Sequence, residues 1–146
     1  MIEQFYLLTT IVLGLFAGSL LTEASILVPY WRRMKPSEFF DLHSSLGPNL
    51  FRYFAPLTAL AVGIAVATTI LDDFNNLAWV ISAGLSVITL AIFFIYFRVA
   101  NNSFAEHDLS DSDLEKELRR WSNWHWFRTV LMIIALAASI YGHRVG

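Results

Sequence analysis

Four long apolar stretches constrain this chain more than any other feature of its sequence. They cover residues 5–29, 50–71, 77–97 and 124–141. About 20 apolar residues in an α-helix cross the hydrocarbon core of a bilayer, where every backbone polar group must be satisfied within the protein. The sequence therefore predicts an all-α integral membrane protein, an up-down four-helix bundle that forms a single four-span transmembrane domain over residues 1–146.

The composition supports a membrane protein and excludes several classes of site and partner. Hydrophobic residues make up 56% of the chain and charged residues 15%, with a mean hydropathy of +0.54, whereas soluble domains carry about 25% charged residues. The absence of cysteine excludes disulfides, zinc–thiolate sites and iron–sulfur clusters. A net charge of −2 argues against nucleic acid as a partner. The expected partners are membrane lipid and a lipophilic small molecule. The sequence also allows the protein to form a homo-oligomer.

The basic residues predict the orientation of the chain in the membrane. Nine of the ten Lys and Arg residues lie on or beside the connections at 30–49 and 98–123, and Arg144 alone lies at the other end. The connection at 72–76 has no basic residue. The positive-inside rule then places the two basic connections in the cytoplasm and both termini outside. We expect a multi-pass protein of the cell (inner) membrane with no cleaved signal peptide.

Both cytoplasmic connections show helix signals. Pro36 begins a predicted short interfacial helix at 37–46, which carries His43 across the cytoplasmic mouth and ends at Gly47-Pro48. The other connection is predicted to be polar and turn-like over residues 101–113. There the capping-box pattern Ser112-Asp113-Leu114-Glu115 starts a fourth helix of about 30 residues, whose first two turns project from the membrane.

Polar side chains from all four helices converge at the cytoplasmic side. Glu23 lies roughly 9 Å inside the end of the first helix, and His125 roughly 7 Å inside the end of the fourth. The third helix ends in Asn101-Asn102, and His43 precedes the second helix. An ionisable residue in a membrane span is costly and is therefore a candidate functional residue. We expect one polar pocket built from Glu23, His43, Asn101, His125 and Arg128.

Three interpretations of this pocket remain open. In the first, Glu23, His43 and His125 bind a divalent metal such as iron, copper or zinc. In the second, Glu23 or His125 is a general base beside an apolar substrate, without a metal. In the third, Glu23 pairs with Arg128 or His125 only to fix the register of the helices. Haem is disfavoured, because only one histidine lies within the membrane and axial ligation across a bundle needs a facing pair.

Several motifs together resemble a known family. They are Gly18 and Glu23 followed by Pro29-Tyr30-Trp31, the Pro48 and Pro56 region, Asn101-Asn102, and Trp121-x-x-x-His125-x-x-Arg128. The chain resembles the anthrone oxygenase-like family of small four-helix membrane proteins (domain of unknown function 1772). Some fungal members of that family oxidise anthrones to anthraquinones with dioxygen. The resemblance maps Glu23, His125 and Arg128 to the polar, catalytic pocket.

The expected function is that of a small membrane oxygenase or oxidoreductase acting on a lipophilic, anthrone-like aromatic substrate. Candidate substrate-binding residues are Phe39, Phe40, Phe51, Asn101, Trp121 and Trp124. The main alternative is a non-catalytic four-span protein that binds a partner protein or anionic lipid through its basic loops. Transport is less well supported, because no ionisable residues step through the bundle toward the far side.

Overall fold

The computed structural model describes residues 2–145, and these residues form helices and short turns without a strand. Four helical segments are long and apolar enough to cross a membrane: Ile2–Trp31, Pro36–Leu71, Leu77–Glu106 and Asp111–Arg144. The first comprises α1 (Ile2–Thr22), η1 (Glu23–Leu27) and α2 (Val28–Trp31), and the second is α3 (Pro36–Leu71). The third comprises α4 (Leu77–Ile92), η2 (Phe93–Phe97) and α5 (Arg98–Glu106), and the fourth is α6 (Asp111–Val145). The predicted all-α membrane bundle is confirmed, while the predicted domain bounds include residues 1 and 146, which lie outside the described part.

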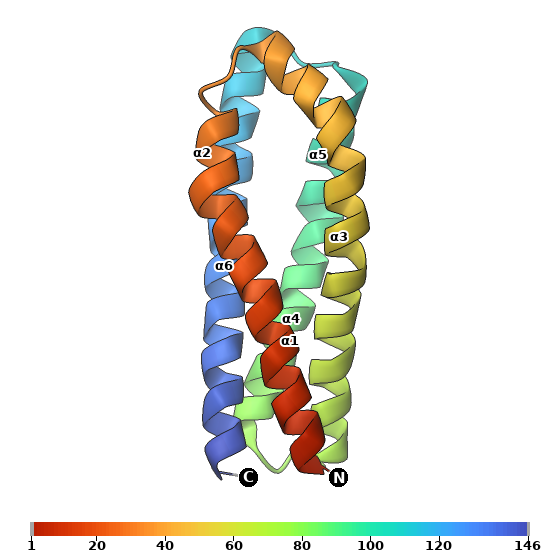
Figure 1. Ribbon diagram of the computed structural model, residues 1–146, viewed down its shortest axis with the longest axis vertical. Coiled ribbons are helices and arrows are strands. Elements are labelled where there is room, and N and C mark those ends of the chain that lie inside the picture. The colour runs from red at the N-terminus through yellow and green to blue at the C-terminus, as the bar shows by residue number, and fades with distance from the viewer. Residues whose placement is uncertain (1, 146) are drawn as a thin grey trace.

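The helices form an up-down bundle with both described ends of the chain at the same end of the molecule (Figure 1). α1 packs against α3 and α6, and α4 also packs against both of them. The helices therefore follow one another around the bundle in the order α1, α6, α4, α3. Leu and Ile side chains on the outer faces remain exposed, as expected where a bundle meets lipid.

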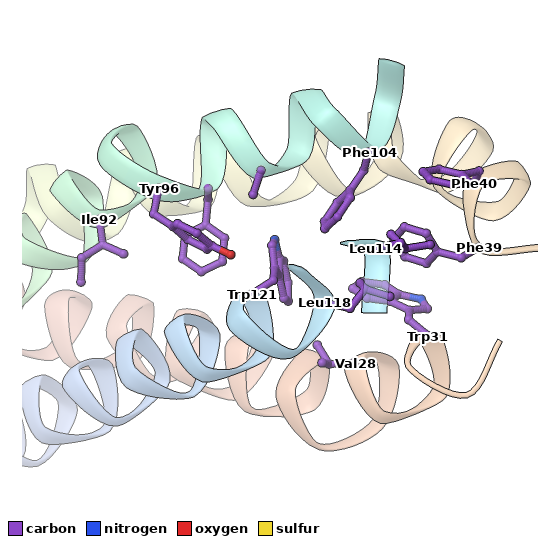
Figure 2. Packing of buried hydrophobic residues seen from close by; sticks show 12 residues of the cluster. Val28, Trp31, Phe39, Phe40, Ile92, Tyr96, Phe104, Leu114, Leu118 and Trp121 are labelled. Atoms are coloured by element: carbon purple, nitrogen blue, oxygen red, sulfur yellow. The ribbon is translucent and has the colours of Figure 1, made fainter. Parts of the chain in front are cut away.

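Two hydrophobic clusters fill the two halves of the bundle. The half nearer the termini is filled by Leu13, Phe16 and Leu20 of α1, with Ala61 of α3 and Met132 of α6 among their neighbours. The other half is more aromatic, as Figure 2 shows. Its buried residues include Trp31, Phe39, Phe40, Tyr96, Phe97, Phe104, Leu118 and Trp121.

The predicted interfacial helix is part of α3, so the predicted helix end at Gly47-Pro48 is wrong. α3 is helical without interruption over 36 residues and contains Pro48 and Pro56. Its first turns cross the end of the bundle, as expected for the interfacial segment, and the helix then bends into the second span (Figure 1). A proline removes one backbone donor and bends a helix, whereas a complete break near the membrane would leave several backbone groups unsatisfied.

The third and fourth helices also differ from their predicted bounds. The third helix continues through Asn101-Asn102 to Glu106, and His107 ends it in the left-handed region at φ 54°. The amide of Asp113 donates to Oγ of Ser110 at 3.3 Å, and the Ser110 hydroxyl donates to Oδ2 of Asp113 at 2.7 Å. The fourth helix is therefore capped at Ser110, two residues before the predicted capping box, and runs for 35 residues.

Two of the four helices contain a π-helical segment, which the sequence did not predict. In η1 the amide of Val28 donates to the carbonyl of Glu23, and in η2 the amide of Arg98 donates to the carbonyl of Phe93, five residues earlier in each case. Both segments contact α6 at one level, because Glu23 and Phe97 both approach His125. Segments of this kind are frequent at functional sites, and these two flank the predicted pocket.

At the opposite end, near the termini, polar and aromatic contacts fasten the helices together. The hydroxyl of Tyr6 donates to Oδ1 of Asp72 at 2.5 Å, and the Tyr6 ring stacks on Trp79 with centroids 4.8 Å apart. The side-chain amide of Asn76 donates to the carbonyl of Gly142 at 3.1 Å. A Cβ atom on Gly142 would lie 3.0 Å from Cε2 of Trp79, so this glycine allows α6 to pack closely on α4.

Candidate functional site

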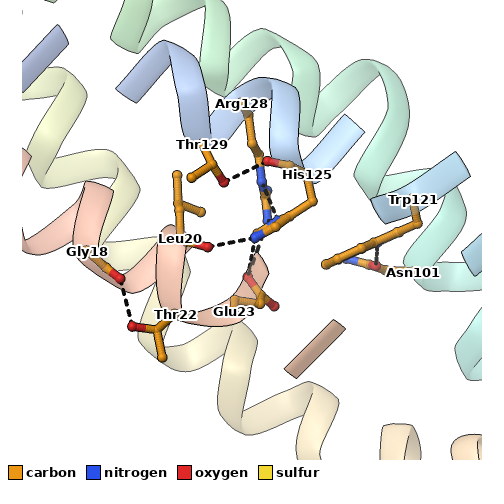
Figure 3. A network of polar contacts seen from close by, with 9 residues as sticks. All are labelled: Gly18, Leu20, Thr22, Glu23, Asn101, Trp121, His125, Arg128 and Thr129. Atoms are coloured by element: carbon orange, nitrogen blue, oxygen red, sulfur yellow. Dashed lines mark hydrogen bonds and ion pairs between the residues drawn. The ribbon is translucent and has the colours of Figure 1, made fainter. Parts of the chain in front are cut away.

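Glu23, His125 and Arg128 lie together inside the bundle (Figure 3), and Glu23 and His125 were expected to meet from their similar depths. Oε2 of Glu23 is 3.6 Å from Nε2 of His125 and 3.5 Å from Nη2 of Arg128. Glu23 is 4% exposed and His125 is fully buried. The carboxylate comes from η1 and the two nitrogen-bearing side chains from α6, so the group joins the first and fourth helices.

Both ring nitrogens of His125 are engaged by the protein. Nε2 donates to the carbonyl of Leu20 at 2.9 Å. Nδ1 accepts from Arg128, at 3.0 Å from Nε and 2.7 Å from Nη2. Since a guanidinium only donates, this arrangement requires a neutral imidazole that carries its proton on Nε2. His125 therefore orients Arg128 and has no free nitrogen to act as a base.

Aromatic rings hold the Arg128 guanidinium in place. Its central carbon lies 3.9 Å from the centroid of Phe97 and 5.8 Å from that of Trp121. Trp121 stacks almost parallel to His125, with centroids 4.9 Å apart and an interplanar angle of 9°. Its indole nitrogen donates to Oδ1 of Asn101 at 3.0 Å. Cation–π contact and stacking thus fix a buried cation beside Glu23.

Glu23 has unused hydrogen-bonding capacity in this network. Among the described residues, its Oε2 atom is buried and has no hydrogen-bond partner. Arg128 lies at ion-pair distance and offsets the negative charge without donating to this oxygen in hydrogen-bond geometry. A buried acceptor without a partner is rare in proteins and calls for an explanation. Glu23 is also one of the residues that line a cavity.

The cavity has a volume of about 880 Å³ and lies between the four helices in the half of the bundle away from the termini. This volume falls within the range of small-molecule sites, about 300–1,000 Å³. Most of the lining is apolar or aromatic, including Phe16, Phe39, Phe54, Phe93 and Phe104. The polar lining residues are Glu23, His43, Ser44, Thr58, Thr89, Asn101, Asn102 and Arg128. Glu23 and Arg128 are the two lining residues with charged side chains.

The structure brings most, but not all, of the expected pocket residues to this cavity. Phe39, Phe51, Asn101 and Trp121 line it together with Glu23, His43 and Arg128. Phe40 and Trp124 are not among the lining residues. Phe40 stacks on His107 with centroids 4.6 Å apart, and Trp124 stacks on Tyr96 at 5.5 Å. His125 lies behind the wall, where it holds Arg128.

The expected metal ligands Glu23, His43 and His125 do not form one cluster. Residues 2–145 contain no group of three or more His, Asp or Glu side chains placed to hold a metal ion. His43 packs instead between Phe39 and Phe104, with ring centroids at 5.7 Å and 5.6 Å. The nitrogens of His125 are occupied, and the Arg128 cation already lies beside the carboxylate. This donor set does not fit a divalent cation.

Sequence reasoning did not find Leu20, Phe97 or the two π-helical segments. Leu20 contributes only a backbone carbonyl, for which the sequence has no side-chain signal. Phe97 is one of several phenylalanines in η2, and its contact with Arg128 depends on the π-helical register. The position of Glu23 within an apolar stretch predicted its depth in the membrane, but it did not predict that Leu20 and Phe97 would contact this network.

Together the fold and the site define a multi-pass membrane protein with a buried carboxylate–guanidinium pair at the wall of a largely apolar cavity. The anthrone oxygenase family model matches residues 45–138, and the chain belongs to this family. The matched stretch includes Asn101, Trp121, His125 and Arg128, while Glu23 lies before it. No curated protein and no solved structure matches the chain.

Proposed function

We propose that this protein is a membrane oxygenase that oxidises a lipophilic aromatic substrate of the anthrone type, with Glu23 as the general base. The observation that carries the proposal is the buried carboxylate of Glu23, a residue that lines a cavity of about 880 Å³ and whose Oε2 atom has no hydrogen-bond partner among the described residues. Membership of the anthrone oxygenase family supports oxygen chemistry. The aromatic lining suits a flat, apolar substrate.

The reaction balances with dioxygen as the only co-reactant. The Glu23 carboxylate removes a proton from the acidic ring CH₂ group, which leaves a delocalised carbanion. The carbanion transfers an electron pair to dioxygen as the carbon–oxygen bond forms, and Glu23 returns its proton to the resulting peroxide. Loss of the second C–H proton with cleavage of the O–O bond gives the carbonyl product and water. One anthrone and one dioxygen thus become one anthraquinone and one water.

Arg128 and His125 have distinct supporting roles in this proposal. The Arg128 guanidinium, 3.5 Å from Glu23, favours the ionised carboxylate and then faces the negative charge of the carbanion. His125 touches neither the cavity nor the substrate and is a positioning residue, because it fixes Arg128 through Nδ1. Asn101 and Trp121, joined by a hydrogen bond, supply a polar edge and an aromatic face to the substrate.

The distribution of basic residues supports placing the site on the cytoplasmic side. Arg32, Arg33 and Lys35 follow α2, and Lys116, Arg119 and Arg120 lie on the projecting part of α6 at the same end. Arg144 alone lies near the termini. By the positive-inside rule the cavity then lies near the cytoplasmic surface, with both termini outside.

The proposal is tested with purified protein reconstituted in liposomes that contain anthrone. Oxygen uptake and the absorbance of anthraquinone are followed together, and protein-free liposomes measure spontaneous oxidation. We expect faster uptake with protein, one dioxygen consumed per anthraquinone formed, and no hydrogen peroxide released. Rates equal to those of protein-free liposomes for anthrone and for its hydroxylated derivatives would contradict the proposal.

A further inference from the structure

Aromatic side chains, which we call the cap cluster, pack at the end of the cavity that faces away from the termini: Trp31, Phe39 and Phe104, which line the cavity, and Phe40, which packs against Phe39. All four are buried. The rings of Phe39 and Phe104 meet edge to face with centroids 5.2 Å apart, and Figure 2 shows how these side chains fill the space between α2, α3 and α5. Their packing fills part of this end of the bundle.

The cavity-lining residues that are exposed lie on α3 and on the η2–α5 segment. A side chain that both lines a cavity and is exposed at the molecular surface marks the place where the cavity reaches that surface. On α3 these residues are Ser44, Pro48, Phe51 and Ala59, and on the facing helix they are Phe94, Asn102 and Ala105. Phe51 is 59% exposed and Phe94 is 56% exposed. We call the opening edged by these two rings the lateral window.

The packing of the helices explains why the opening lies at this position. α3 packs against α4 on one side of the window and against α5 on the other, so the window lies at the level of η2 between these two contacts. On the other side of α3, a hydrogen bond of 2.7 Å between Ser19 and Tyr53 joins α1 to α3. Tyr53 lies only two residues after Phe51, so the bridge and the window are at similar depth.

The residues around the window are those expected where the acyl chains of a bilayer meet the lipid head groups. Ile95 and Val99, next to the window on the same helix, are 76% and 67% exposed. Arg52 and Arg98, also exposed, lie one residue after Phe51 and four residues after Phe94. Long basic side chains extend toward lipid head groups. The window therefore lies just below the head groups, facing hydrocarbon.

We propose that the lateral window is the route by which the lipophilic aromatic substrate passes from the bilayer into the cavity. This proposal rests on the proposed function for the class of compound that moves, while the route itself rests on the packing and exposure described above. A compound dissolved among the acyl chains can reach Glu23 without crossing water. The rings of Phe51 and Phe94 offer it stacking contacts on the way.

Because the chain has no cysteine, single cysteines can be placed and labelled selectively. The test variant is Phe94→Cys, and its matched control is Ile95→Cys, the adjacent exposed residue that does not line the cavity. Each variant is labelled with a bulky maleimide in liposomes. Anthracene, an unreactive aromatic compound that dissolves in the bilayer, serves as the probe. Its binding is followed in a stopped-flow instrument by energy transfer from tryptophan to anthracene. Phe51→Cys provides a second window variant in case Phe94→Cys does not fold.

We expect the label at position 94 or 51 to slow probe binding about tenfold or more by obstructing passage, and the label at 95 to leave the rate unchanged. A spin label at position 94 should be relaxed more by oxygen, which partitions into lipid, than by a water-soluble nickel chelate. An unchanged rate of anthracene binding with either window label, or stronger relaxation of the spin label by nickel, would overturn the proposal that the window is the route of entry. Failure of the unlabelled protein to bind anthracene would overturn both proposals, whereas window-dependent binding without anthrone oxidation would overturn the proposed function alone.

Discussion

Arg128 donates two hydrogen bonds to Nδ1 of His125, three residues before it on α6, at 3.0 Å from Nε and 2.7 Å from Nη2. The same imidazole donates from Nε2 to the carbonyl of Leu20 on α1. One histidine thus aims the cation at Glu23 and ties the fourth helix to the first.

His125→Ala should reduce both stability and activity. It leaves the Leu20 carbonyl without its side-chain partner, creates a cavity and releases Arg128, and the loss of unfolding free energy should be about 2–4 kcal/mol. Denaturation in detergent measures this loss, and anthrone oxidation per folded protein measures the change in activity. Trp126→Ala, at the adjacent lipid-facing position, is the control and should retain most of both. An active and stable His125→Ala protein would contradict the positioning role.

Arg128→Met should be more damaging alone than in combination with Glu23→Gln. Alone it leaves a buried carboxylate without its cation, which costs about 3–5 kcal/mol. In the double variant there is no buried charge to compensate, so part of the lost stability should return. A double-mutant cycle on unfolding free energies measures the coupling between the two residues. Strictly additive effects would show that the 3.5 Å contact does not couple Glu23 and Arg128.

Two glycines should respond differently to substitution by alanine. A Cβ on Gly142 would lie 3.0 Å from Cε2 and 3.2 Å from Nε1 of Trp79, so Gly142→Ala should destabilise the protein by about 1–3 kcal/mol through overpacking. A Cβ on Gly18 would meet nothing within 4 Å, so Gly18→Ala should be neutral or stabilising by up to about 1 kcal/mol. Melting temperatures of both variants give the comparison, and equal effects would contradict the close packing of α6 on α4.

Purified protein should contain far less than one equivalent of iron, copper or zinc. The nitrogens of His125 are occupied and the Arg128 cation lies beside Glu23, so a divalent ion would meet repulsion and too few ligands. Elemental analysis of wild type beside His125→Ala provides the measurement. Near-stoichiometric metal in wild type that disappears in the variant would contradict the assignment of Glu23 as a metal-free base.

The sequence predicted the membrane bundle and the meeting of Glu23 with His125, because hydrophobic length sets the depth of each residue along its helix. It did not predict that α3 passes through Gly47-Pro48 or that the third helix passes through Asn101-Asn102. These motifs end helices in water, but burial of Phe39 and Phe104 and the cost of free backbone groups favour continuing both helices here. The local propensity was overridden by tertiary packing.

Within the site, the sequence predicted the polar residues of the cavity better than its aromatic residues. Glu23, Arg128 and Asn101 reach the cavity as expected. Phe40 and Trp124 do not, because each stacks on another aromatic ring, His107 and Tyr96 respectively. Which face of an aromatic-rich helix points inward depends on the exact rotation of that helix. The π-helical segments change this rotation near Glu23 and Phe97, and apolar periodicity does not reveal them.

Glu23→Gln tests the central claim most directly, because it keeps the size and shape of the side chain and removes its ability to take a proton, together with the charge that pairs with Arg128. Oxygen consumption with anthrone should be measured for the variant and wild type in the same liposomes, at equal amounts of folded protein. A general base contributes about 10²–10⁴-fold to the rate, so we expect a loss of that size, together with a lower melting temperature because Arg128 stays buried without its counter-charge. Oxidation at the wild-type rate by a folded Glu23→Gln protein would show that Glu23 is a structural partner of Arg128 and not the base.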